Sequence, residues 1–202
     1  AKLDELMANP QRFLQQRAAS MGKETPEWVA LALIKLAAND HQLALKQMNT
    51  LKLVKSLNSE QLEWVWAVIA RQAAMSFDPK AVVYFESTGL GQGLSDELLA
   101  WKVRAALRSE DGPRWPMVES AVQAMSPNAQ KDPAWVYWRA RALMAKQPAS
   151  TTTLPQALMA LQSIAGHHGF YEQLALEQLG RKVTAPARPE PRPSALPPRL
   201  PG

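Results

Sequence analysis

The sequence contains no cysteine among its 202 residues. This absence excludes disulfide bonds, thiolate metal sites and a cysteine nucleophile, but it leaves the compartment open, because cytosolic and periplasmic proteins both often lack cysteine. No apolar run reaches the ~18 residues that a membrane-spanning helix needs. Lys2 and Asp4 follow Ala1, without the apolar segment of a signal peptide. We therefore expect a cytosolic protein, a mature exported protein or a fragment, with no membrane span.

Convincing β-strand patterns are missing as well. The one β-leaning stretch, residues 81–85, follows the pair Asp78-Pro79, which is typical of a helix start. Hydrophobic residues make up 47% of the chain, which is enough for a sizeable core. These observations predict an all-α protein.

The positive charge is concentrated at the C-terminal end. The net charge is +5, but residues 181–202 hold five basic side chains and one acidic side chain, so that the rest of the chain is nearly neutral. A basic patch on a folded surface attracts polyanions, whereas a basic tail is much weaker evidence for such a partner. We expect no nucleic-acid partner.

Helix starts are marked by capping side chains. Four of these precede a proline, and a cap oxygen accepts a hydrogen bond from a free N–H while proline loses no bond at the first helical position. They stand at Asn9-Pro10, Thr25-Pro26, Asp78-Pro79 and Asp132-Pro133, with further caps at Asn58 (and Gln61) and Ser95. The predicted helices are 10–20, 26–38, 40–53, 59–76, 79–88, 95–109, 113–125, 133–146, 154–165 and 169–179.

Tryptophans recur at the period of a helical repeat. They stand at 28, 66, 101 and 138, so that successive ones are 35 to 38 residues apart. Such a period is typical of stacked repeats, in which no unit buries its apolar face alone. The sequence thus predicts a right-handed superhelix of antiparallel helix hairpins, a tetratricopeptide-like α-solenoid, with hairpins at 26–53, 59–88, 95–125 and 133–165.

The same tryptophans are the first candidate functional residues. Aromatic rings suit sugar faces, but the helical period of Trp28, Trp66, Trp101 and Trp138 favours buried positions in the seams between hairpins. Basic residues follow three of them, and we expect these to join neighbouring helices by ion pairs or by stacking on rings. They are Arg71, Arg104 and Arg141.

Two other groups of residues resemble catalytic or ligand sites. His167-His168 lies between glycines without acids at ligand spacing, and we expect a polar turn, with His41 on the surface. Glu86 precedes the glycine-rich residues 88–93, but no strand or lysine with phosphate-loop spacing accompanies them, and a helix end with Gly89 as C-cap is expected. The sequence predicts no metal and no cofactor.

A family resemblance rests on two segments. Trp135-Val-Tyr-Trp138-Arg-Ala-Arg141, followed by a short helix at 158–165 and then by Phe170-Tyr171-x-x-Leu-Ala-x-Glu177-x-Leu-Gly, resembles the end of the superhelical region of soluble lytic murein transglycosylases. The resemblance is good over 130–180 and only architectural over 26–125. In that family the second segment links a ring of paired helices to a lysozyme-like catalytic domain.

The resemblance implies a function for the chain. Those enzymes cleave peptidoglycan glycan strands in the periplasm, leave an anhydro-sugar end and use no cofactor. Their catalytic glutamate follows the linker helix, whereas Glu86 precedes it, so the resemblance implies a non-catalytic scaffold that positions the catalytic domain and the glycan. Two alternatives stay open, a free-standing tetratricopeptide-like module that binds a peptide or protein, and a small helical enzyme that uses Glu86.

The chain divides into three predicted parts. Residues 1–168 form the helical-repeat domain, 169–180 the linker-type helix and 181–202 an extended tail that holds seven of the 16 prolines. We expect the tail to run along a groove, with Leu196 and Leu200 as apolar anchors. The interface candidates are Trp66, Trp101, Trp138, Arg141, Phe170, Tyr171 and Glu177.

Overall fold

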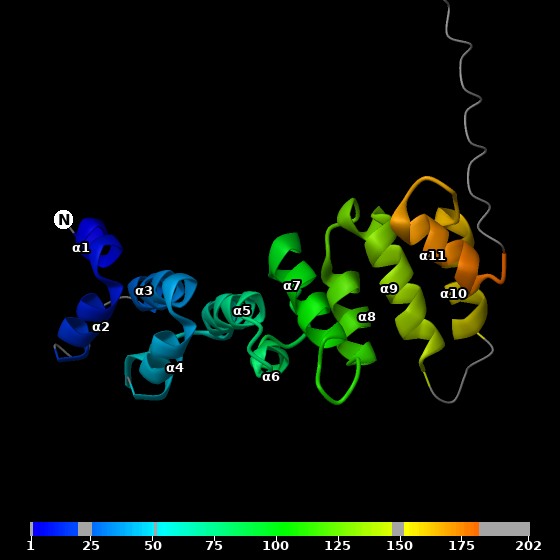
Figure 1. Cartoon of the computed structure of the whole chain (residues 1–202). Coiled ribbons are helices and arrows are strands. Elements are labelled where there is room, and N and C mark those ends of the chain that lie inside the picture. The colour runs from blue at the N-terminus through cyan, green and yellow to red at the C-terminus, as the bar shows by residue number, and fades with distance from the viewer. Residues whose placement is uncertain (1, 20–25, 51, 147–151, 182–202) are drawn as a thin grey trace, which may run out of the picture.

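The computed structural model describes residues 2–19, 26–50, 52–146 and 152–181. Within these residues every regular element is a helix, in agreement with the predicted class (Figure 1). The elements are α1 (Lys2–Ala8), α2 (Pro10–Ala19), α3 (Pro26–Asn39), α4 (His41–Thr50), η1 (Lys52–Ser56), α5 (Ser59–Met75), α6 (Ala81–Glu86), α7 (Asp96–Leu107), α8 (Trp115–Ala124), η2 (Ala129–Lys131), α9 (Pro133–Met144), α10 (Thr153–Ile164) and α11 (Phe170–Gln178).

Several helix starts follow from the predicted caps. The Asn58 side chain accepts a hydrogen bond from Gln61 N at 2.8 Å, and Gln61 returns one from its side chain to Asn58 N, which completes the capping box. Asp132 Oδ1 accepts from Ala134 N at 2.8 Å. The predicted start of α6 at residue 79 was wrong. Asp78 Oδ1 accepts a hydrogen bond from Lys80 N and holds a turn, so the helix begins at Ala81. Helix α1 was not predicted.

Neighbouring helices pack in chain order. Extensive contacts join α3 to α4, α5 to α6, α7 to α8 and α9 to α10, and they also join α3 to α5 and α5 to α7. The next step differs, because α9 packs on α8, and α7 and α9 make no comparably extensive contact within the described residues. Figure 1 shows the resulting elongated row of helices from α1 to α11. The right-handed superhelical winding stays a prediction.

The tryptophan prediction needs a correction. Trp28, Trp66, Trp101 and Trp138 are each half-buried rather than buried. The reason is that alanine fills the seams, and alanine lets helices approach too closely for an indole ring to fit between them. The buried alanines include Ala67, Ala70, Ala73, Ala74, Ala100, Ala105, Ala106, Ala140 and Ala142.

Further predictions concern a membrane span, the proline-rich tail and the division of the chain at residue 168. No helix among the described residues is long and apolar enough to cross a membrane. The predicted docking of the proline-rich tail concerns residues 182–202, which lie outside the described residues. The division at residue 168 stays a prediction, although α11 packs on both α9 and α10.

Candidate functional site

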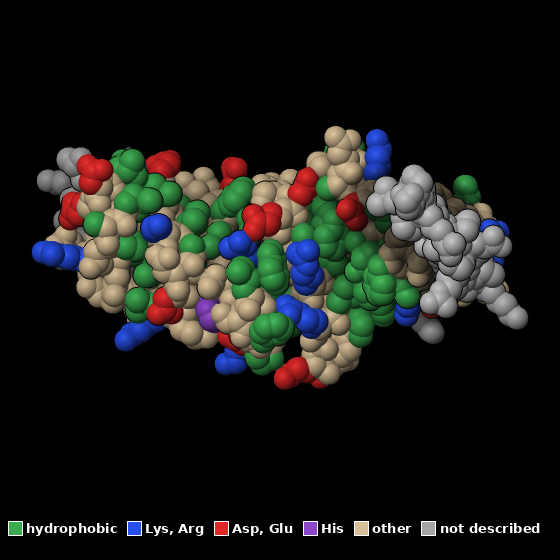
Figure 2. All heavy atoms as spheres, turned by 45° about the horizontal axis from the view of Figure 1, so that its top comes forward, with side chains coloured by type: hydrophobic (Ala, Val, Ile, Leu, Met, Phe, Trp, Pro, Cys, Tyr) green, Lys and Arg blue, Asp and Glu red, His purple; other side chains and the backbone are tan. Residues whose placement is uncertain are grey.

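An open groove lies where α7 and α9 diverge. Its volume is about 510 Å³, and its walls come from the C-terminal half of α7, the start of α9 and the start of α11. We call it the arginine–aromatic groove, and its lining residues are Arg104, Leu107, Arg108, Asp132, Ala134, Trp135, Trp138 and Tyr171. Figure 2 shows one face of the molecule on which basic side chains lie between hydrophobic surfaces near the middle of the row.

The aromatic wall of the groove is held by contacts between α9 and α11. Trp138 Nε1 donates a hydrogen bond to the Tyr171 hydroxyl at 3.3 Å, and the two rings meet edge to face with centroids 6.4 Å apart. Tyr137 lies behind them, 4% exposed, with its ring 5.2 Å from that of Trp138. The start of α11 is fixed in turn by Glu172, whose Oε2 accepts from Gly169 N at 2.9 Å. These contacts present half-buried indole and phenol rings to the groove.

Arg104 lies between two tryptophans. Its guanidinium carbon is 5.0 Å from the centre of the Trp101 ring on α7 and 5.5 Å from that of the Trp135 ring on α9. Stacking of this kind holds a guanidinium in place while its N–H edge stays accessible. The exposed Arg104 side chain makes no hydrogen bond or ion pair with any described residue. The site therefore contains an oriented cation whose donors are unused.

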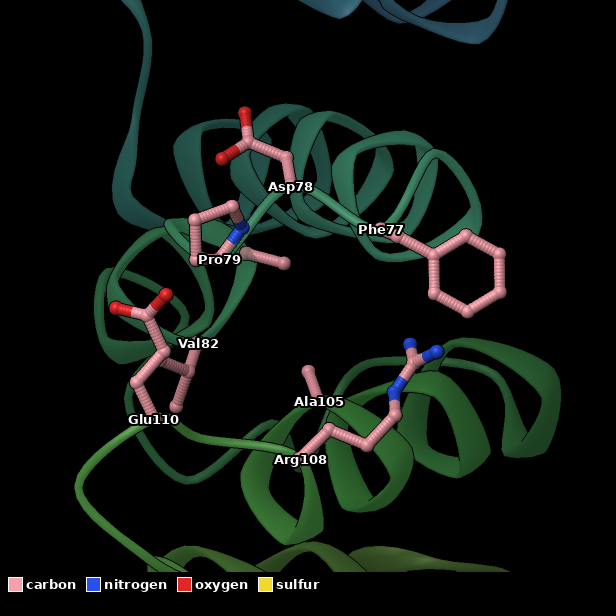
Figure 3. Close-up of a pocket in the computed structure, with 8 residues that line it drawn as sticks. Phe77, Asp78, Pro79, Val82, Ala105, Arg108 and Glu110 are labelled. Atoms are coloured by element: carbon pink, nitrogen blue, oxygen red, sulfur yellow. The ribbon is translucent and has the colours of Figure 1, made fainter.

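Arg108 lines the same groove and is bonded to the protein. Its Nη2 donates to the Ala74 carbonyl at 2.9 Å, and its guanidinium carbon lies 5.0 Å from the centre of the Phe77 ring. Arg108 also lines a second hollow of about 270 Å³ between α6 and the end of α7. Figure 3 shows the Arg108 side chain rising from α7 toward Phe77, with Glu110 on the opposite side of the hollow. The two hollows thus meet at Arg108.

Phe77, two residues after the end of α5, has an unusual backbone conformation. Its φ is +58°, a left-handed value that glycine adopts freely and a bulky residue adopts at a cost of about 1–2 kcal/mol. The ring is 79% exposed. An exposed ring in a strained position is a feature that sequence analysis missed, because no local pattern distinguishes it from an ordinary helix end.

Lys102 is buried on the opposite side of α7 and was also missed. Its side chain is 0% exposed, and Nζ donates to Thr88 Oγ1 at 3.0 Å and to the Gly89 carbonyl at 2.6 Å. Burial lowers the pKa of the Lys102 ammonium, and the Coulomb attraction of Glu63 opposes this in part. The glycine-rich residues 88–93 therefore present oxygen acceptors to a lysine, the reverse of what a phosphate loop presents.

The remaining predicted arginines both join helices. Arg71 Nη2 on α5 lies 2.6 Å from Glu97 Oε1 on α7. Arg141 Nη1 donates to the Tyr137 hydroxyl at 3.0 Å, and its guanidinium carbon lies 5.9 Å from the centre of the Trp115 ring on α8. With Arg104, all three arginines that follow a tryptophan make the contacts between helices that the spacing predicted.

The other candidates lie outside the groove. Trp66 stacks on Tyr84 with centroids 6.2 Å apart, on α5 and α6. Phe170 is 70% exposed at the start of α11, and Glu177 is exposed near the end of that helix. The structure thus brings Trp138 and Tyr171 together in the groove, whereas Trp66, Phe170 and Glu177 belong to other surfaces.

The two motifs that resemble sites have other surroundings. Glu86 is exposed at the end of α6 and lines neither hollow. His167 and His168 are exposed in the turn before α11. The expectation for His41 needs a correction, because its Nε2 lies 3.4 Å from Asp78 Oδ2 with only 12% of the side chain exposed. His41 thus tethers α4 to the turn after α5.

The comparisons with known proteins find similarity at the level of structure. No family model and no curated protein matches the sequence. Among solved structures, the chain is similar to an inactive mutant of the lytic transglycosylase Slt from Pseudomonas aeruginosa, with 25% identity and a TM-score of 0.62. The match covers 88% of this chain and 28% of that one. The chain thus shares its helical fold with part of a lytic transglycosylase.

Proposed function

We propose that the chain is a non-catalytic superhelical scaffold within a peptidoglycan lytic transglycosylase of the periplasm. In this role it positions the lysozyme-like catalytic domain and the glycan strand. The observation that carries the proposal is the likeness to Slt over 88% of this chain. The arginine–aromatic groove supports it further, because aromatic rings beside polar donors suit a sugar strand.

The acids near the grooves are poor candidates for glycan cleavage. Cleavage of a glycosidic bond needs an acid held at the bond, often with a second carboxylate or with a group of the substrate as nucleophile. Asp132 Oδ1 in the arginine–aromatic groove already accepts the α9 capping bond from Ala134 N. In the second hollow, Asp78 is bonded to His41 and Lys80. Asp132 and Asp78 therefore have structural roles, and Glu110, the third acid of these hollows, is exposed to solvent. This arrangement favours a scaffold over an enzyme.

The proposed contact with the catalytic domain is the outer face of α11. Phe170 presents an exposed ring there, and Glu177 presents an exposed carboxylate. Tyr171 lies next to Phe170, with ring centroids 5.2 Å apart, and its other edge meets Trp138. One helix therefore links the proposed domain contact to the groove.

Purified chain incubated with peptidoglycan sacculi tests the proposal. We expect the chain to sediment with the sacculi and to release no anhydromuropeptides, as measured by chromatography of the soluble products. Glu86→Gln should behave identically. Release of product that disappears in Glu86→Gln would show that the chain is a small helical enzyme.

A free-standing module that binds a peptide is the second candidate, because the groove is open and carries unused donors at Arg104. Such a module would not sediment with sacculi. A lysozyme-like domain encoded in the same reading frame would decide for the scaffold.

A further inference from the structure

We propose that Arg104, held between Trp101 and Trp135, is the receptor for the carboxylate of a lactyl ether on a sugar ring, and that the adjoining aromatic wall stacks that ring. The inference rests on the proposed function and specifies its ligand. The corresponding sugar is a muramic acid residue whose lactyl carboxylate is free, as in a glycan strand without stem peptides.

Arg104 is oriented before any ligand arrives. The two rings at 5.0 and 5.5 Å restrict the guanidinium, so binding an anion costs little side-chain entropy. Its donors have no partner among the described residues. A guanidinium binds a carboxylate through two parallel N–H···O bonds, which fixes the position of the anion.

The charge of Arg104 and the aromatic rings of the groove adjoin one another. Trp135 contacts Arg104 and lines the groove beside Trp138 and Tyr171. A ligand that uses both must carry its carboxylate next to a flat, partly apolar ring. A carboxylate of a stem peptide lies beyond the lactyl amide, several rotatable bonds farther from the sugar than a free lactyl carboxylate, so it matches this juxtaposition less well.

The groove carries more positive than negative charge in its lining. Its ionisable lining consists of Arg104, Arg108 and Asp132, which gives an excess of positive charge at the α7 wall. Asp132 lies on the α9 side, at the cap of that helix. An anionic sugar is therefore attracted to the α7 wall and oriented across the groove.

The test compares two oligosaccharides of equal length. One is a peptide-free tetrasaccharide of alternating N-acetylglucosamine and N-acetylmuramic acid, and the other is chitotetraose, which lacks the carboxylates. Titration calorimetry of the full chain should give roughly tenfold or greater preference for the first, as expected of a charge-assisted bond. Arg104→Gln should abolish the preference, whereas Arg114→Gln, which removes the same charge outside the groove, should retain it.

The outcomes separate the two proposals. Equal affinity of the wild-type chain for both oligosaccharides, or a preference that survives in Arg104→Gln, overturns the inference even when the chain sediments with sacculi. Tighter binding of a muropeptide with its stem peptide attached also overturns it, because the carboxylate then comes from the peptide. Failure to bind sacculi overturns the proposed function itself. Circular dichroism and urea unfolding of Arg104→Gln establish that this variant is folded.

Discussion

Two cations two residues apart on α7 have opposite surroundings. Lys102 is buried and donates to Thr88 Oγ1 and to the Gly89 carbonyl. Arg104 is exposed, stacked between Trp101 and Trp135, and donates to no described residue. The difference follows from their directions on the helix. The Lys102 side chain points toward the loop before α7, whereas the Arg104 side chain points toward the arginine–aromatic groove.

The comparison shows how to separate a structural cation from one available to a ligand. Lys102 has its desolvation offset by local oxygen acceptors, so its removal affects the fold. Arg104 is oriented by rings that leave its hydrogen-bonding edge unused, which is why we propose that it acts in ligand binding and not in the fold. Neither residue type nor sequence position reveals this, because both are basic residues within three positions of Trp101.

The largest expected effect is on stability, at Lys102. Lys102→Ala removes a buried side chain and both hydrogen bonds to the 88–93 loop, and we expect the free energy of unfolding to fall by about 2–5 kcal/mol. Urea unfolding followed by circular dichroism measures it. Lys102→Met keeps the aliphatic stem and should cost less. If both variants are as stable as the wild type, the buried ammonium has no structural role.

A second effect concerns pH and the same residue. Burial lowers the pKa of Lys102 in the folded state below its ordinary value of 10.5. Between the lowered value and 10.5 the unfolded chain holds the extra proton, so the free energy of unfolding rises with pH through that window, by at most about 1.4 kcal/mol per pH unit.

The measurement is the difference in unfolding free energy between wild type and Lys102→Met as the pH is raised to 10.5. The wild type should gain relative to the variant. Burial, together with the charge of Asp78, raises the pKa of Tyr84, and this contribution cancels because both proteins contain it. A difference that is constant or that shrinks would contradict the lowered pKa of the buried lysine.

The smallest effects on the free energy of unfolding are expected for the two arginines of the groove, and they should differ from each other. Arg108→Gln loses the bond to the Ala74 carbonyl and the stacking on Phe77, and should cost about 1–2 kcal/mol. Arg104→Gln loses ring contacts alone and should cost about 0.5–1 kcal/mol. Urea unfolding at low and high salt measures both. The reverse order would show that Arg104 has the larger structural role.

Sequence analysis predicted most helices because their signals are local. Asn58 and Asp132 lie within three residues of the N–H groups that they cap, so their pattern is readable without the fold. Residues 2–8 lack a cap followed by proline, and the helix there was missed for that reason. The contacts of Arg71 and Arg141 were predicted from their spacing behind tryptophans, which is also a local pattern.

The groove could be predicted only in part. Trp138 and Tyr171 were singled out, but the divergence of α7 from α9 depends on how the link through η2 seats α9 on α8. From the sequence alone, Lys102 is an ordinary helix lysine, because its burial depends on the tertiary contact with the 88–93 loop. Tyr137, and not Trp138, is the buried ring of α9, because the larger indole lies at the edge of the gap.

The change of packing partner at α9 has a consequence for how such an array can vary. Helices α3, α5 and α7 contact one another in succession, so hairpins before α5 extend the row without touching the groove. The lining residues all come from α7, α9, α11, the residue after α7 and the residue before α9. The length of the row and the lining of the groove are therefore independent: duplication or loss of an early hairpin would change how far the molecule extends and leave the groove as it is.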